Sequence, residues 1–218
     1  MSVLVNLASA GDHSISPWIA AFSGGLAGAL LTVSWQWFRA WFDSPRLTAS
    51  FDGNIPGCLI QTPAGFLQKD LADIARTCRQ HYVRLKVKNA GRTVARGVVA
   101  NLVEIRQTNA QGVTTEFSDE VLDLVVGLVG GTTIPVLPRG CHRFFDIAHV
   151  EQRDDTIAHH FDVKATPFRL ADLKFGPGKF EAKIQVAAEN ADPITTSARW
   201  SWNGTIDGVS VVAEPKDS

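Results

Sequence analysis

The sequence predicts one N-terminal transmembrane α-helix followed by a mainly-β domain, an antiparallel β-sandwich with one short inserted helix. Residues 14–38 contain no charged side chain and no histidine. Short segments of alternating apolar and polar residues fill most of the remaining chain, and glycine, proline, asparagine or aspartate separates them. The predicted divisions are an N-terminal tail (1–14), the helix with a short juxtamembrane extension (15–43), the β-sandwich domain (44–213) and a C-terminal tail (214–218).

The uncharged segment is long enough to cross a bilayer as a helix. Its 25 residues would extend about 37 Å at about 1.5 Å per residue, and the hydrocarbon layer is about 30 Å thick. Tryptophan is typical of both membrane interfaces because its ring is amphipathic. The predicted membrane-interface residues are Trp18, Trp35, Trp37, Arg39 and Trp41.

The alternatives to a membrane span are a secretory signal peptide and a buried core helix. A secretory signal peptide needs a positively charged start, an apolar run of about 7–15 residues and a small-residue cleavage site. Residues 1–14 contain no lysine or arginine, and the apolar run that follows is longer. A buried core helix rarely needs 25 uncharged residues. The membrane span is the favoured interpretation.

Flanking charges and cysteines predict the orientation. Arg39 and Arg46 follow the span, and no lysine or arginine precedes it. The positive-inside rule then places the C-terminal domain in the cytoplasm and the N-terminus outside. Cys58, Cys78 and Cys141 have unrelated spacings, which favours a reducing compartment over a disulfide framework. The predicted location is therefore the inner (cytoplasmic) membrane, crossed once.

Small residues form two parallel files on the predicted span. The predicted helix-packing residues are Ala20, Gly24 and Gly28 in one file and Ala21, Gly25 and Ala29 in the other. Small side chains four residues apart let another helix backbone approach closely. The predicted partner is an integral membrane protein or a second copy of this chain. The alternative is that glycine is simply common in membrane helices.

Strict alternation predicts two long strands. In residues 81–91, Val83, Leu85 and Val87 alternate with basic residues, and residues 179–190 repeat the pattern. Shorter strands are predicted at 47–52, 58–62, 95–106, 131–137, 142–149, 160–165, 197–203 and 208–213. Many short strands with few helical segments are typical of an antiparallel sandwich.

Two segments depart from this alternation. Residues 65–80 place apolar residues at helical spacing, which predicts the inserted helix before the first long strand. Residues 118–131 fit a strand or a helix, and they contain more apolar residues than one face should hold. This second segment is a candidate lining for a partner surface.

The turns between strands carry a resemblance to a known class of module. The stretch RLKVKNAGRTVARGVVANLVEI is a strand that ends in Asn-x-Gly, followed by a small residue at Ala95 and a second strand. It resembles bacterial immunoglobulin-like (CARDB-like) β-sandwich modules, and LPRGCHRFFDI, VAAENADP and ARWSWNG fit the later strands. The resemblance covers about residues 80–213. It implies an immunoglobulin-like sandwich that serves adhesion, assembly or carbohydrate-proximal roles without catalysis.

No catalytic or metal-binding motif is found in the sequence. It contains no CxxC, HExxH, GxSxG or phosphate-binding loop signature. His142 and His149 lie near Asp146, with His159 and His160 further on. Strict alternation puts His142 and Asp146 on one strand face and His149 on the other. Solvated loop histidines are the favoured interpretation, and a metal site is the alternative.

Trp200 and Trp202 are predicted to share one strand face with Ala198. This face is interpreted as core, and a stacking platform for a sugar or a base is the alternative.

Composition and motifs together predict a non-enzymatic protein without a cofactor. The 21 Lys and Arg nearly balance the 22 Asp and Glu, which disfavours nucleic acid as a partner. The predicted function is a single-pass membrane-anchored interaction or accessory subunit that docks into a larger membrane protein assembly through its helix and β-sandwich. The alternative is a membrane-anchored sensor or effector whose sandwich binds a ligand or foreign protein and whose helix oligomerises.

Overall fold

The structure is a computed structural model that describes residues 29–39, 43–63, 78–117, 121–127, 129–153, 156–164 and 175–212. The chain divides into two compact units, Met1–Asp43 and Ser44–Ser218.

Two parts of the first unit are described. They are a helix over residues 29–39 and the single residue Asp43. The eleven residues of this helix extend about 16 Å at about 1.5 Å per residue, roughly half the thickness of a hydrocarbon layer. Among the described residues, no helix has both the length and the apolar character needed to span a membrane. The predicted single-pass transmembrane helix over 15–43 is therefore wrong. Residues 15–28 and 40–42 of that prediction lie outside the described residues, and a run without charges indicates hydropathy rather than secondary structure.

The second unit is built from strands. They are β1 (Leu47–Ser50), β2 (Leu59–Pro63), β3 (Cys78–Asn89), β4 (Ala95–Asn109), β5 (Thr114–Phe117), β6 (Leu122–Val126), β7 (Thr133–Leu137), β8 (His142–Arg153), β9 (Thr156–Phe161), β10 (Val163–Lys164), β11 (Gly178–Ala188), β12 (Ala191–Trp202) and β13 (Val209–Val211). The mainly-β prediction is confirmed, and every segment predicted as a strand overlaps an observed one. The predicted inserted helix falls mostly on 64–77, which lie outside the described residues, and Cys78 already belongs to β3.

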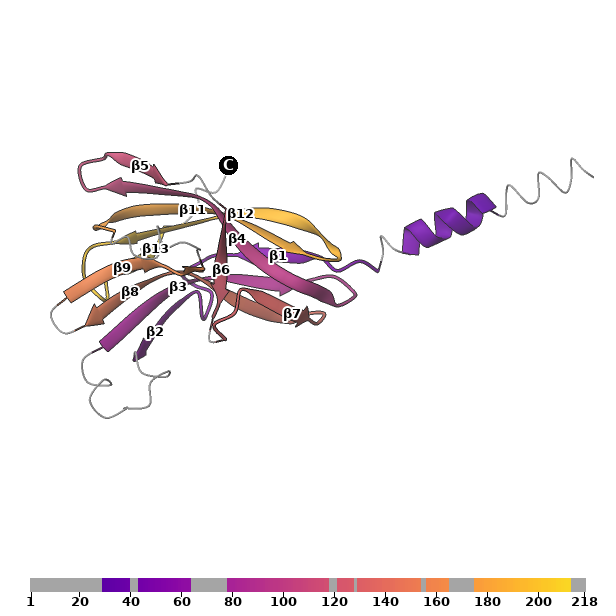
Figure 1. The fold of residues 1–218 in the computed structure, drawn as a ribbon, viewed down its shortest axis with the longest axis horizontal. Coiled ribbons are helices and arrows are strands. Elements are labelled where there is room, and N and C mark those ends of the chain that lie inside the picture. The colour runs from indigo at the N-terminus through magenta and orange to yellow at the C-terminus, as the bar shows by residue number, and fades with distance from the viewer. Residues whose placement is uncertain are drawn as a thin grey trace, which may run out of the picture. The chain divides into compact units, whose positions relative to one another are not determined.

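Hydrogen bonds join the strands into one antiparallel sheet in the order β1-β3-β8-β6-β4-β11-β12-β13 (Figure 1). The other strands attach at its sides: β2 to β3, β5 and β7 to β4, β9 to β8, and β10 to β6. The predicted immunoglobulin-like sandwich of two separate sheets is wrong, because β6 pairs with both β8 and β4. The ambiguous segment 118–131 contains this connecting strand.

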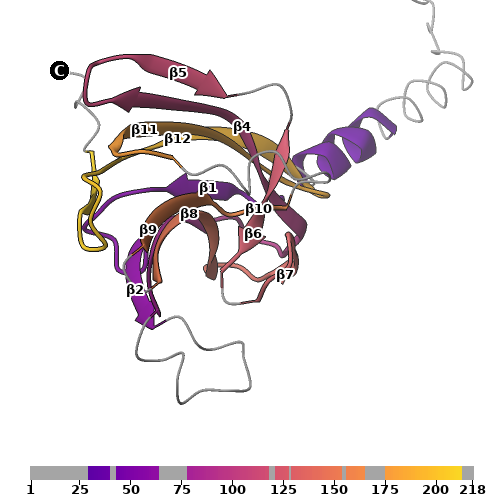
Figure 2. The same ribbon diagram turned by 60° about the vertical axis from the view of Figure 1, so that its left-hand side comes forward.

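The sheet curls around a single apolar core. Its curvature brings β1 back beside β12, without strand pairing between them in the described residues (Figure 2). Alternation produces the core, since Val83, Leu85 and Val87 on β3 and Ile184 on β11 are fully buried. The curled sheet therefore encloses a core as a sandwich does, but it does so with one continuous layer.

The Asn-Ala-Gly turn after β3 connects three strand ends through one buried amide. Asn89 Nδ2 donates to the carbonyl oxygens of Thr93 at 2.7 Å and Leu137 at 3.0 Å. Asn89 Oδ1 accepts from the backbone N–H of Gly91 at 3.0 Å and of Arg46 at 3.3 Å. All hydrogen-bonding positions of this amide are used, so the turn serves as a structural anchor of the fold.

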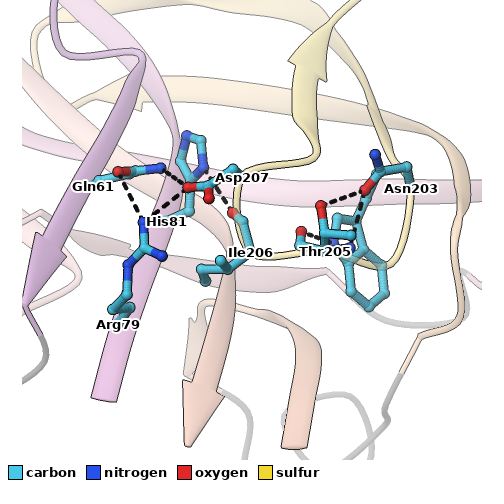
Figure 3. A network of polar contacts seen from close by, with 8 residues as sticks. Gln61, Arg79, His81, Asn203, Thr205, Ile206 and Asp207 are labelled. Carbon is cyan, nitrogen blue, oxygen red and sulfur yellow. Dashed lines mark hydrogen bonds and ion pairs between the residues drawn. The ribbon is translucent and has the colours of Figure 1, made fainter. Parts of the chain in front are cut away.

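A loop over residues 203–208, here called the clasp, fastens the last hairpin to the β2–β3 edge (Figure 3). Asp207 Oδ1 lies 2.9 Å from Arg79 Nη2 and also accepts from Gln61 Nε2. The Ile206 carbonyl oxygen lies 3.2 Å from His81 Nδ1, and the Ile206 side chain is buried in the core. Side chains therefore close the curl at this end, where no strand pair does in the described chain.

Candidate functional site

The predicted site residues are only partly described. Trp18, Ala20, Ala21, Gly24, Gly25, Gly28 and Trp41 lie outside the described residues. Ala29 begins the described helix, and Trp35, Trp37 and Arg39 lie on it with exposed side chains. Arg39 is the last described residue of the helix: its carbonyl oxygen accepts from Asp43 N at 2.8 Å, and its Nε lies 4.0 Å from an Asp43 carboxylate oxygen.

The helix presents a broad apolar surface. At about 100° per residue, Thr32, Gln36 and Arg39 share one narrow polar side. The remaining circumference is almost entirely apolar, and its large residues are 47–74% exposed. They are Leu30, Leu31, Val33, Trp35, Trp37 and Phe38. The Trp35 and Phe38 rings are stacked with centroids 6.1 Å apart. An exposed apolar surface of this kind is typical of an interaction site.

A second candidate site is a polar cluster on the outer face of the β3–β8 pair, and a β-bulge creates it. The register of β3 against β8 shifts between Val83 and Arg84, so Ile147 has no partner. The extra residue moves His149 onto the face that carries Asp146. The prediction that Asp146 and His149 lie on opposite faces is therefore wrong. The signal was present in the sequence, because two consecutive apolar residues, Ile147 and Ala148, interrupt the alternation.

Arg84 and Asp146 form a buried ion pair in this cluster. Arg84 Nε lies 2.7 Å from Asp146 Oδ1, and the two side chains are only 5% and 8% exposed. The distance suits a hydrogen bond, but neither atom has a hydrogen-bond partner of good geometry among the described residues. The contact is thus a close charge pair with poor alignment. The Tyr82 ring covers the guanidinium, with its centroid 4.9 Å from Arg84 Cζ.

His149 links the ion pair to a second carboxylate. His149 Nδ1 donates to Asp162 Oδ1 at 2.9 Å, and its ring lies between those of Tyr82 and His160, with centroids 5.5 Å and 5.3 Å away. The second carboxylate oxygen of Asp162, Oδ2, is buried without a hydrogen-bond partner in the described structure. The cluster therefore contains one guanidinium and two carboxylates, and the His149 ring carries a proton-accepting nitrogen beside them.

Burial and neighbouring charges shift the pKa values of this cluster. Burial raises the pKa of Asp146 to about 6 against the opposing effect of Arg84. Burial alone would lower the pKa of His149, but the hydrogen bond to Asp162 and its charge outweigh burial and raise that pKa. Burial also raises the pKa of Tyr82 to about 12. The cluster can therefore take up and release protons near neutral pH.

On the opposite face of the sheet, His159 lies in the aromatic core. It is fully buried and stacked on Phe180, with centroids 4.5 Å apart, and Trp200 Nε1 donates to its Nε2 at 3.2 Å. Burial lowers the pKa of His159 to about 3, so the ring is neutral. The interpretation of this histidine as solvated is wrong. Trp200 and Trp202 are both buried, and the core interpretation of this pair is confirmed.

The described residues contain no group of three His, Cys, Asp or Glu side chains that could hold a metal ion. Comparison with protein-family models and with curated proteins gives no match for this chain. The resemblance to immunoglobulin-like modules thus stays a resemblance.

Proposed function

We propose that the protein is a non-enzymatic accessory subunit that docks into a larger protein assembly through its N-terminal helix, with the β unit as a second contact. The exposed apolar surface of helix 29–39 is the observation that carries this proposal. The predicted inner-membrane location of that assembly stays a prediction.

The composition of the helix surface supports docking. Leu, Val, Trp and Phe side chains each favour burial by about 1.5–3 kcal/mol, so an exposed surface of six such residues is stabilised by a partner. Tryptophan is also among the residues that most often dominate binding energy at interfaces. Trp35 and Trp37 project about 160° apart around the helix axis. We therefore expect the partner to enclose the helix on more than one side.

The docking proposal is tested by replacing the two described tryptophans together. The full chain is tagged at its C-terminus, expressed from its native locus, crosslinked and extracted gently, and its partner is quantified against the chain itself. Trp35→Gln with Trp37→Gln is expected to reduce the recovered partner at least about tenfold, because both anchors lose apolar contact. Two differently tagged copies distinguish a second copy of this chain from a different protein.

The matched control replaces two exposed valines of the β unit. Val113 and Val136 are 57% and 56% exposed, similar to the helix residues. Val113→Gln with Val136→Gln is expected to leave partner recovery unchanged. Equal recovery from the tryptophan variant and the native chain, at equal abundance, contradicts docking through the helix. Sedimentation of the same lysates tests the membrane location independently.

A further inference from the structure

Strand β6 is the seam of the curled sheet. It pairs with β8 through Val125–Asp146 and Val126–Phe145, and with β4 through two further residue pairs. In the described chain it is the one strand that joins the β1-β3-β8 side of the sheet to the β4-β11-β12 side. Because this pairing is short, few backbone hydrogen bonds hold it. A change in charge or packing beside β6 therefore changes the stability of the pairing readily.

Both acidic residues of the polar cluster, Asp146 and Asp162, contact this seam through their backbones. Val125 N donates to the Asp162 carbonyl oxygen at 3.2 Å, and Asp162 N donates to the Ile147 carbonyl oxygen at 3.0 Å. Gly127 N donates to the Phe144 carbonyl oxygen at 2.9 Å. A side-chain carbon on Gly127 would lie only 2.7 Å from Asp146 Oδ1. The backbone of β6 and of Gly127 after it therefore contacts the residues that carry the cluster's charges.

The charge balance of the cluster depends on one proton. The titratable and charged groups that face it are Tyr82 and Arg84 from β3, Asp146, His149 and Glu151 from β8, His160 from β9, and Asp162 after β9. Asp123, the remaining charged residue of β6, is exposed. With neutral His149, the Arg84 guanidinium and the ionised Asp146 and Asp162 carboxylates together carry a charge of about −1. A proton on His149 cancels that charge.

We propose that this cluster is a proton-operated lock on the β6 seam, in which protonation of the His149–Asp162 pair tightens the seam and deprotonation loosens it. Uncompensated charge in a buried site is unfavourable, so loss of the proton favours states in which the cluster meets water. Opening at β6 provides such a state, because β6 pairs with Asp146 and its Val125 N–H donates to the Asp162 carbonyl oxygen.

The direction of the titrations agrees with this lock. The pKa of His149 is raised in the folded protein, so its stabilising contribution is fully present below pH 6.5 and is lost as the pH rises through the folded pKa. The pKa of Asp146, raised to about 6, has the same sign. Both groups bind protons more tightly in the closed structure than in an open one.

Hydrogen exchange of the β6 amides tests the lock in the full chain. Protection factors of Val125 and Gly127, which remove the intrinsic pH dependence of exchange, are measured by NMR from pH 6.5 to pH 8.5. We expect protection to fall about tenfold for each unit by which closure raises the pKa of His149. The imidazole proton shifts of His149 should titrate over the same range.

Two variants separate the lock from ordinary structural damage, because they should move the seam in opposite directions. His149→Gln cannot be protonated, and it should hold the Val125 and Gly127 amides at the low protection that the native chain shows at pH 8.5. Asp162→Asn removes one buried negative charge, and it should hold them at the high protection of pH 6.5. Neither variant should show a pH dependence in this range.

The matched control is His142→Gln, at an exposed histidine of the same strand outside the cluster. It should keep the native pH dependence. Native protection factors that do not change between pH 6.5 and pH 8.5, or equal protection in the two cluster variants, would overturn the proposal.

Discussion

At the scale of single residues, the outer face of β3 and β8 holds an unusual ion pair. Arg84 and Asp146 are almost fully buried and lie close together, yet their contact lacks good hydrogen-bond alignment. Removing two charges from water costs several kcal/mol per ion, and only excellent geometry recovers it. This pair therefore adds less to stability than its short distance suggests, and it leaves Asp146 easy to protonate.

A double-mutant cycle tests this account of the pair. Arg84→Met should lower the free energy of unfolding by about 3 kcal/mol at pH 8, where Asp146 is left as an unpaired buried carboxylate. The loss should be smaller at pH 5, where Asp146 is protonated. Arg84→Met with Asp146→Leu should cost less than the sum of the two single changes. Urea unfolding at both pH values measures these terms, and strictly additive losses at pH 8 would contradict the account.

At the scale of elements, the clasp shows how a short loop replaces strand pairing. Asn203 Oδ1 accepts from Thr205 N at 3.0 Å and from Thr205 Oγ1 at 2.8 Å, and Trp202 Nε1 donates to the Thr205 carbonyl oxygen at 2.8 Å. These local bonds shape the loop, and Asp207 then reaches Arg79 on β3. Gly208 lies so close to Asn203 Oδ1 that an added side-chain carbon would collide with it.

The packing at Gly208 predicts a specific sensitivity. Gly208→Ala should destabilise the β unit by about 1–3 kcal/mol, because Asn203 cannot move without giving up its bonds to Thr205. Exchange protection should fall first at Thr205 and Gly208, whose amides donate to Asn203 Oδ1 and to the Thr205 carbonyl oxygen. Gly176→Ala is the matched control, since an added carbon there meets nothing within 4 Å. A similar change in the unfolding midpoint for both variants would show that the collision at Gly208 is not the cause.

At the scale of the whole molecule, the two faces of the sheet respond to pH with opposite signs. Asp146, with its pKa raised from 3.8 to about 6, adds stability as the pH falls through this range. His159 has its pKa lowered from 6.5 to about 3, so its contribution to the free energy of unfolding is lost as the pH falls below 6.5. Between about pH 6 and pH 4, the two residues change the free energy of unfolding with pH by similar amounts and in opposite directions.

The native chain is therefore expected to show a nearly flat unfolding free energy from about pH 6 to about pH 4. His159→Phe removes one of the opposing slopes, so the stability of that variant should rise by up to about 2 kcal/mol over the same interval. Chemical denaturation at closely spaced pH values measures both curves. Parallel curves for the native chain and the variant would contradict the assignment of opposite signs.

Sequence patterns predicted the strands of the β unit well. Alternation in β3 and β11 reflects a local rule, since successive side chains point to opposite faces of a strand. The core interpretation of Trp200 and Trp202 depends on the same rule. The uncharged run before residue 39 predicted a membrane span that no described helix provides, because hydropathy describes preference for a medium and not secondary structure.

The polar cluster could not be predicted from alternation. One unpaired residue, Ile147, reverses the face of every later side chain on β8, so strict alternation placed His149 on the wrong side. Arg84 is also distant in sequence from the other three residues, and Asp162 lies 13 positions after His149. Only the pairing of β3 with β8 and the position of the chain after β9 bring them together.

By itself, the sequence determined which segments form strands, where turns such as Asn89-Ala90-Gly91 interrupt them, and which faces are apolar, because these properties depend on neighbours along the chain. The tertiary structure alone decided that β6 joins the strands into one curled sheet, that the clasp closes it and that Arg84, Asp146, His149 and Asp162 form one cluster. Those features depend on register between distant strands, and a single bulge is enough to change register without changing the local pattern.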